Sequence, residues 1–103
     1  GMGILLDEDG KLMMESKGFN KNYLPVSLEH NKAYEYVKNS SLNWTFVCPP
    51  DIINEGPTGI FKTAIDHLPA ESSYKINSGD LALFMLKELE KNEHIKHRVG
   101  ISN

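Results

Sequence analysis

The segment from Leu42 to Ile52, which reads LNWTFVCPPDI, places the strongest constraint on how this chain can fold. Residues 42–48 are dense in apolar and β-prone side chains, which is typical of a strand buried on both faces of a parallel sheet. Pro49 and Pro50 end that strand, because neither can donate a backbone hydrogen bond to a neighbouring strand. A helical pattern ends shortly before Leu42. A helix that leads through a short connection into a buried strand predicts an α/β fold.

Two helices are predicted, one on each side of this segment. The first runs from Leu28 to Asn39, with Ser27 as N-cap and Glu29 in the first turn, where the helix dipole favours a carboxylate. Its expected buried face consists of four apolar residues at helical spacing: Leu28, Ala33, Tyr36 and Val37.

The second helix begins after residue 78 and has the clearer pattern. Ser78 is the expected N-cap, and Asp80 lies in the first turn. The apolar residues form one stripe, at positions Leu81, Ala82, Met85, Leu86 and Leu89. The opposite, solvated side is expected to carry Lys87, Glu88, Glu90 and Lys91.

The remaining chain predicts turns and short strands within a single domain of residues 1–103. Residues 3–25 are expected to form loops with a short hairpin, whose turn lies at Asp9-Gly10. Residues 51–59 are expected to be a loop, and Ile60–Ile65 and Tyr74–Ile76 to be two strands that could form a hairpin. Arg98–Ser102 is expected to be the final strand. Gly1 and Met2 are interpreted as a tag remnant and a start methionine.

Composition excludes several classes of protein. The chain has 103 residues and a net charge of −3, which gives no reason to expect a nucleic-acid partner. Its longest apolar run is too short to cross a membrane, and no basic segment followed by an apolar one indicates a signal peptide. Cys48 is the single cysteine, so no internal disulfide is expected, and a reducing cytoplasmic location follows.

Few residues suggest chemistry. Asp51 follows the Pro-Pro corner at the carboxyl end of a strand, where open α/β sheets bind ligands, although the same residue could simply form an Asx turn. His30 could donate a proton near neutral pH, and Lys32 could lower the pKa of a neighbouring acid, but both could also be plain surface residues. His94 and His97 have no evident third ligand, so no metal site is expected.

Several of these pieces, in this order and spacing, resemble the C-terminal part of atypical short-chain dehydrogenase/reductases. The resemblance is to the NmrA-like NAD(P)-binding group, and within it to the biliverdin reductase B or flavin reductase type. The matching pieces are the helix Glu29–Asn39, the segment Ser41-Leu-Asn-Trp, Val47-Cys-Pro-Pro-Asp-Ile52, Pro57-Thr-Gly-Ile-Phe61 and Ile76-Asn-Ser-Gly-Asp-Leu-Ala-Leu-Phe-Met-Leu86.

The resemblance implies a truncated Rossmann-like fold with two main helices and four to five short strands, from a parent that binds NADP or NAD. It places the nicotinamide beside Pro49, Pro50, Asp51 and Ile52. Asp51 stands where the biliverdin reductase B type has histidine. If Lys32 represents the lysine of the family's Tyr-x-x-x-Lys pair, the tyrosine position is Leu28. The tyrosine that usually serves as the acid is then missing, and His30 is its nearest substitute by position.

Two functions follow as hypotheses. In the first, the chain is an NAD(P)H-dependent oxidoreductase homologue without the glycine-rich cofactor loop, inactive alone and unable to bind a dinucleotide tightly. His30, Lys32 and Asp51 would then serve catalysis in an assembled site. In the second, it is a non-catalytic regulatory or interaction module. In both, a sheet edge left open by truncation predicts a homo-oligomer or a partner chain.

Overall fold

The computed structural model describes residues 1–103, which form helices and short strands in alternation. The elements in chain order are the 3-10 helices η1 (Met2–Ile4), η2 (Met13–Glu15) and η3 (Lys21–Tyr23), helix α1 (Leu24–Lys38), strands β1 (Thr45–Cys48), β2 (Asp51–Ile53), β3 (Lys62–Ile65) and β4 (Lys75–Asn77), helix α2 (Ser78–Lys91) and strand β5 (His97–Ser102).

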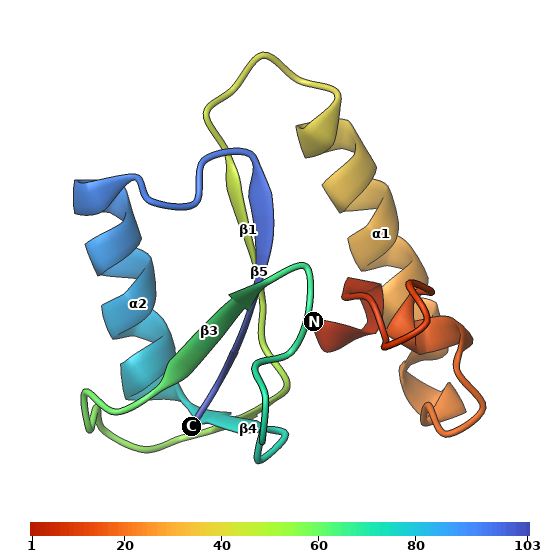
Figure 1. Cartoon of the computed structure of the whole chain (residues 1–103), viewed down its shortest axis with the longest axis horizontal. Helices are drawn as coiled ribbons and strands as arrows, with labels where there is room; N and C mark the ends of the chain where they lie inside the picture. Colours follow the sequence, from red (N-terminus) through yellow and green to blue (C-terminus); the bar gives the residue numbers. More distant parts are fainter.

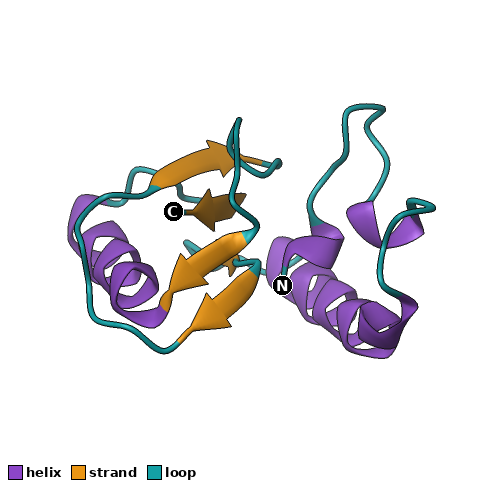
Figure 2. Ribbon diagram, turned by 90° about the horizontal axis from the view of Figure 1, so that it is seen from below, coloured by secondary structure: helices purple, strands orange, loops and turns teal.

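The strands form two small sheets between the two helices. In the first sheet the order is β1-β5-β3, with β1 parallel and β3 antiparallel to β5. In the second, β2 pairs in parallel with β4. Figures 1 and 2 show α1 and α2 on opposite sides of these strands. The expected α/β class is therefore confirmed, with two helices and five short strands.

The strand β2 and the pairing of β3 and β4 differ from expectation. Residues 51–53 were expected to lie in a loop, but they form a strand, because β4 supplies a parallel partner in which Ile52 faces Ile76 in register. The two strands expected to form a hairpin do not pair with each other. β3 pairs with β5 and β4 with β2, so both pairings join segments distant in sequence.

Helix α1 begins one turn earlier than its polar pattern suggests. Pro25 lies in its first turn, where a missing N–H costs no hydrogen bond. Ser27 is thus inside the helix and buried, so its assignment as N-cap was wrong. The buried face is also different. Tyr34 packs edge-on against Trp44 and Phe46, with ring centroids 5.7 and 5.5 Å away, whereas Tyr36 is 81% exposed.

Helix α2 has the expected location but a different cap and a different buried face. Asn77, not Ser78, is the N-cap, and its side chain accepts a hydrogen bond from the Asp80 N–H at 2.6 Å. Glu88, expected in solvent, is buried. The expected apolar stripe is largely exposed instead, at Met85, Leu86 and Leu89.

The interior consists of two clusters, one on each side of the first sheet. One contains Ile4, Leu5, Tyr34 and Cys48, and the other contains Ile76, Phe84, Val99 and Ile101. At Gly100 of β5 a side chain would collide with the His67 carbonyl, so the close approach of that loop requires glycine. No helix is long and apolar enough to span a bilayer.

Candidate functional site

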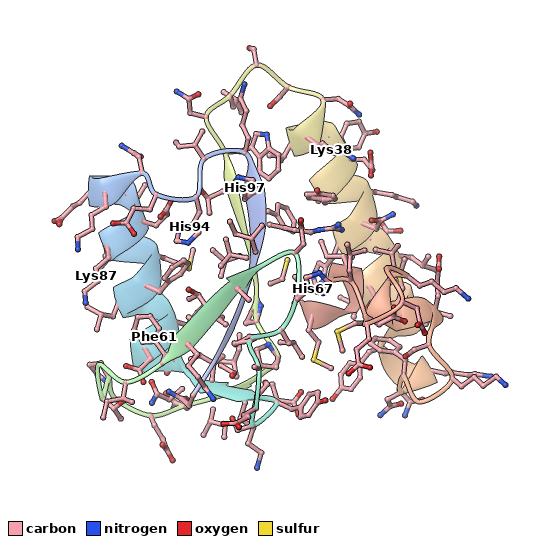
Figure 3. All side chains as sticks on the ribbon, viewed as in Figure 1. Lys38, Phe61, His67, Lys87, His94 and His97 are labelled. Atoms are coloured by element: carbon pink, nitrogen blue, oxygen red, sulfur yellow. The ribbon has the colours of Figure 1, made fainter.

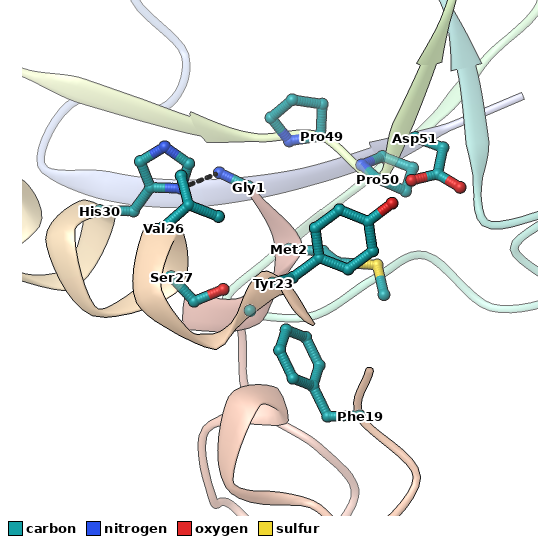
Figure 4. Close-up of a pocket in the computed structure, with 11 residues that line it drawn as sticks. Gly1, Met2, Phe19, Tyr23, Val26, Ser27, His30, Pro49, Pro50 and Asp51 are labelled. Atoms are coloured by element: carbon teal, nitrogen blue, oxygen red, sulfur yellow. Dashed lines mark hydrogen bonds between the residues drawn. The ribbon is translucent and has the colours of Figure 1, made fainter. Parts of the chain in front are cut away.

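A pocket of about 170 Å3 lies at the Pro-Pro corner, where β1 ends and the chain turns into β2. Figure 4 shows that its walls come from the N-terminal segment, the start of α1 and the corner itself. Its lining residues are Gly1, Met2, Gly3, Phe19, Tyr23, Val26, Ser27, His30, Pro49, Pro50 and Asp51. Three segments that are separate in the sequence, within residues 1–3, 19–30 and 49–51, therefore build one site.

One wall of the pocket is a single face of α1 and the turn before it. Tyr23, Ser27 and His30 follow one another at intervals of four and three residues, which places their side chains on one side of a helix. The N-terminal segment packs closely on this face. A Cβ on Gly3 would lie 2.9 Å from the Ser27 Cβ, so glycine permits this contact.

His30 is partly buried in the pocket wall. Its Nδ1 lies 3.2 Å from the backbone nitrogen of Gly1. Burial lowers the pKa of His30. The imidazole is therefore neutral at pH 7, a form that can either donate or accept a proton.

Asp51 faces the pocket from the opposite side. Its carboxylate takes part in none of the three ion pairs of the chain and is exposed. Tyr23 reaches across the pocket, and its hydroxyl points toward Asp51 in Figure 4. Pro49 and Pro50 form a rigid apolar wall beside them. The site thus combines a flat apolar surface with an unpaired carboxylate, a phenol and an imidazole.

Of the residues predicted from the sequence, the structure brings together His30, Pro49, Pro50 and Asp51. Lys32 lies elsewhere. Its ammonium is 2.9 Å from Glu29, and both side chains are more than two-thirds exposed. Ile52 is exposed and does not line the pocket.

Tyr23 is the main residue that sequence reasoning missed. The Tyr-x-x-x-Lys register pointed to Leu28 and left the site without a tyrosine, yet Tyr23 lines the pocket. The signal was present in the sequence. A helix that starts at Leu24, with Pro25 in its first turn, places Tyr23, Ser27 and His30 on one face, whereas a helix capped by Ser27 would leave Tyr23 outside it.

Two other carboxylates are buried and fully engaged in the fold. Asp80 accepts hydrogen bonds from Thr58 N and Gly59 N at 2.9 and 2.8 Å, and from the side chains of Thr58 and Asn103. Burial alone would raise the pKa of Asp80, but these donors, with the Thr58 hydroxyl foremost, hold it well below its usual range. Asp80 therefore ties the loop of residues 56–59 to the start of α2.

Glu88 has the same role at the other end of α2. It accepts hydrogen bonds from His94 N and His94 Nδ1, each at 2.8 Å, and from the Thr45 hydroxyl at 3.2 Å. Figure 3 shows His94 between α2 and the sheet. Burial raises the pKa of Glu88, but the His94 hydrogen bonds outweigh it and lower the pKa overall. His94 is thus part of the fold, and no group of three metal-ligating side chains lies together in the chain.

Cys48 lies at the end of β1, directly before the corner. It is buried, and desolvation raises the pKa of its thiol to about 11. A thiol that remains protonated is a poor nucleophile. Cys48 therefore belongs to the core and not to the chemistry of the pocket.

Comparison with known proteins relates this geometry to one family. Residues 2–92 match the model of a family described as NAD(P)H-binding. No curated protein matches the chain significantly.

Solved structures with the same fold include three informative ones. A putative exported protein from Burkholderia pseudomallei has 30% identity and a TM-score of 0.89, over 100% of this chain and 52% of its own. A putative NADH-flavin reductase from Streptococcus pneumoniae has 27% identity and a TM-score of 0.86, over 99% of this chain and 52% of its own. A putative epimerase from Bacteroides thetaiotaomicron has 25% identity and a TM-score of 0.79, over 98% of this chain and 49% of its own. The chain thus spans about half the length of these proteins.

Proposed function

Because the chain belongs to the NAD(P)H-binding family, we propose that it forms the substrate-facing wall of an NAD(P)H-dependent reductase. The observation that carries this proposal is the meeting of His30, Tyr23 and Asp51 at the Pro-Pro corner. The similarity to a putative NADH-flavin reductase supports reduction as the reaction type.

The pocket fits one end of the dinucleotide and not the other. Flat proline and aromatic surfaces suit a ring such as nicotinamide or the ring of a substrate. No lysine or arginine lines the pocket, so no cationic side chain is present there to bind a diphosphate. These residues also contain no glycine-rich loop of the type that holds a pyrophosphate at a helix N-terminus.

When bound, the cofactor supplies a hydride. The residues of this chain would position the acceptor and manage its proton. Pro49 and Pro50 exclude water from one face, and Asp51 accepts a hydrogen bond that orients the ring. His30, neutral at pH 7, and the Tyr23 hydroxyl are the two groups able to exchange a proton with a bound molecule. Lys32 would have to leave Glu29 before it could assist them.

The dinucleotide then requires residues beyond these 103, whether in a longer chain or in a partner. We expect the isolated chain to bind NADPH weakly and to show no reductase activity. Isothermal titration checks this directly. Micromolar affinity of the chain alone for NADPH would falsify the proposal that the cofactor-binding half of the reductase lies outside these residues.

Complementation tests the reductase itself. The N-terminal half of the Streptococcus pneumoniae relative, produced separately, should restore flavin-dependent NADPH oxidation when mixed with this chain. His30→Gln and Tyr23→Phe should each lower that rate, whereas Lys32→Gln, a change on the exposed face of the same helix, should not. Equal rates for all three variants would show that the pocket residues take no part in the reaction.

We also propose that the chain associates with itself or with a partner. β1 is an edge strand of a sheet in which it runs parallel to β5, and an edge strand presents unpaired N–H and C=O groups with which another chain can pair. Sedimentation over a range of dilutions measures this. A monodisperse monomer at micromolar concentration would contradict self-association.

A non-catalytic interaction module is the second candidate function. It is favoured by the exposed apolar side chains of α2, at Met85, Leu86 and Leu89, the last of which is 77% exposed. If this surface alone matters, Leu86→Ser and Leu89→Ser should abolish complex formation, while complementation should yield no activity in any combination.

A further inference from the structure

An apolar surface runs along the outer edge of β1 and the neighbouring side of α2. Two hollows of about 190 and 200 Å3 lie on it, and both are lined by Thr45 and Val47 of β1 and by Met85 of α2. Leu89 lines the first of them and is 77% exposed. The strand edge and the exposed side of the helix therefore form one continuous face.

This face is almost without charge. Glu88 is the only charged residue that lines either hollow, and its carboxylate already accepts hydrogen bonds from His94 and Thr45. The chain as a whole has a net charge of −3, so two copies repel each other where their charged surfaces meet. An uncharged face is the place where this repulsion costs least.

The two edges of the first sheet differ in their protection. At the β3 edge, Lys62 is exposed, and its ammonium donates to the carbonyls of Ala70 and Glu71 at 3.1 Å, so a loop is held against that strand. A lysine and a covering loop are devices that keep a sheet edge from pairing with another chain. Residues 45–48 of the β1 edge read TFVC and contain neither a charge nor a proline. β1 is therefore the edge that is open to pairing.

The direction of the unpaired backbone groups follows from β5. Arg98 accepts a hydrogen bond from Asp66 N at 3.0 Å on the β3 side, and successive residues of a strand direct their backbone groups to opposite sides. Val99, which lies opposite Val47 in register, therefore directs its groups toward β1. In a parallel pair such a residue bonds to the neighbours of its partner, so Val47 and Thr45 direct their own N–H and C=O groups outward.

A second copy of β1 complements these groups. Thr45 and Val47 point toward α2, whereas Phe46 points to the other side of the sheet, where its ring lies 5.5 Å from that of Tyr34. Residues opposite each other in an antiparallel pair point to the same side. When Phe46 lies opposite Phe46 of the second copy, Thr45 lies opposite Val47, and these two residues exchange both of their outward backbone hydrogen bonds.

The exposed area of the chain agrees with an interface of ordinary size. A compact monomer of 11.6 kDa typically exposes about 5,800 Å2, whereas this chain exposes 6656 Å2. The excess is about 800 Å2, which is the area that each partner of a stable complex usually buries.

We infer that two copies of this chain form a dimer in which their β1 strands pair antiparallel about Phe46. The two-fold axis is perpendicular to the sheet, so α2 of both copies lies on the same side, and Met85 and Leu89 of one copy pack against those of the other. This inference rests on the proposed function, which includes self-association or a partner chain. It identifies the partner as a second copy and adds the surface and the register.

Sedimentation equilibrium of the 103-residue chain tests the surface. Wild-type chain should form a dimer, and Leu89→Glu should raise the dissociation constant at least tenfold, because the interface would bury a charge that has no partner. Ile60→Glu is the matched control, since Ile60 is 79% exposed but lies beside the β3 edge, and should leave the constant unchanged. Circular dichroism confirms that each variant is folded.

A disulfide tests the register. Opposite residues without mutual hydrogen bonds, such as the two Phe46 residues, have Cα atoms about 4.5 Å apart, a separation that a disulfide can bridge. Phe46→Cys combined with Cys48→Ser should therefore form a covalent dimer in air. Thr63→Cys on β3, combined with the same Cys48→Ser, should remain monomeric on a non-reducing gel.

Three results would overturn the inference: a monomeric wild-type chain, unchanged association of Leu89→Glu, or no covalent dimer from folded Phe46→Cys protein. A monomer that binds the N-terminal half of the Streptococcus pneumoniae relative through Leu89 would show that this face receives another chain instead of a second copy. Failure of the proposed function gives a different result, because the dimer would then form as described while the complemented mixture would not oxidise NADPH.

Discussion

The surroundings of α2 and the Pro-Pro corner use acidic residues in opposite ways. Around α2, Asp80 and Glu88 are buried and receive several hydrogen bonds each from loops and strands. At the corner, Asp51 is exposed and has no ion-pair partner. A buried carboxylate with several donors joins parts of the fold, whereas an unpaired one on a pocket wall remains available to a ligand.

This contrast predicts that backbone changes near α2 will be the most damaging. Gly79→Ala should destabilise the protein by about 3 kcal/mol or more, because its Cβ would collide with the backbone of Gly56 and Pro57. Gly18→Ala, next to Phe19 of the pocket wall, is the matched control. No atom lies within 4 Å of its added Cβ, so its effect should be about 0.5 kcal/mol or less. Urea denaturation measures both, and similar losses would refute the distinction between the two regions.

Glu88→Gln should have the next largest effect on stability. The amide NH2 cannot accept from His94 N or Nδ1, so at least one buried donor loses its partner. We expect a loss of about 2 kcal/mol in the free energy of unfolding. Glu90→Gln, an exposed change on the same helix, should cost almost nothing. A Glu88 variant as stable as the wild type would show that this network is dispensable.

Acid should destabilise the protein through these two carboxylates. The folded state lowers the pKa of Asp80 and of Glu88, so the unfolded chain binds protons first as pH falls. The stabilisation that they provide is complete above the ordinary pKa values, near 4, and is lost as pH falls toward the lower folded values. Thermal unfolding at pH 7, 5 and 3 should show that the melting temperature falls mainly between pH 5 and pH 3. This fall should be smaller in Glu88→Gln than in the wild type. A loss between pH 7 and 5 would point to other groups.

Changes at the corner should barely affect stability. Asp51→Ala should shift the free energy of unfolding by about 0.5 kcal/mol or less, because the side chain is exposed and unpaired. Lys32→Gln should behave similarly, since exposed ion pairs contribute about 0–1 kcal/mol. A large destabilisation in Asp51→Ala would mean that this carboxylate also supports the fold, and would weaken its assignment to ligand binding.

The elements that were predicted correctly are those with strong local signals. The Pro-Pro corner ends β1, and α2 begins at residue 78 with Asp80 in its first turn. The predicted helix starts were wrong where two residues close in sequence could each begin the helix. Ser27 and Ser78 are both good capping residues, but Pro25 and Asn77 set the actual helix starts. The second sheet was missed because β2 and β4 are only three residues long and depend on each other.

The sequence alone therefore determined the α/β class, the corner and four of the six predicted site residues, because proline geometry and capping chemistry act within a few residues. Only the tertiary structure decided that Tyr23 faces Asp51, that Glu88 is buried, and that the apolar side of α2 is exposed. These outcomes depend on contacts between segments far apart in the sequence. The free energy of burying a side chain or leaving it in water is set by those contacts, which no local pattern contains.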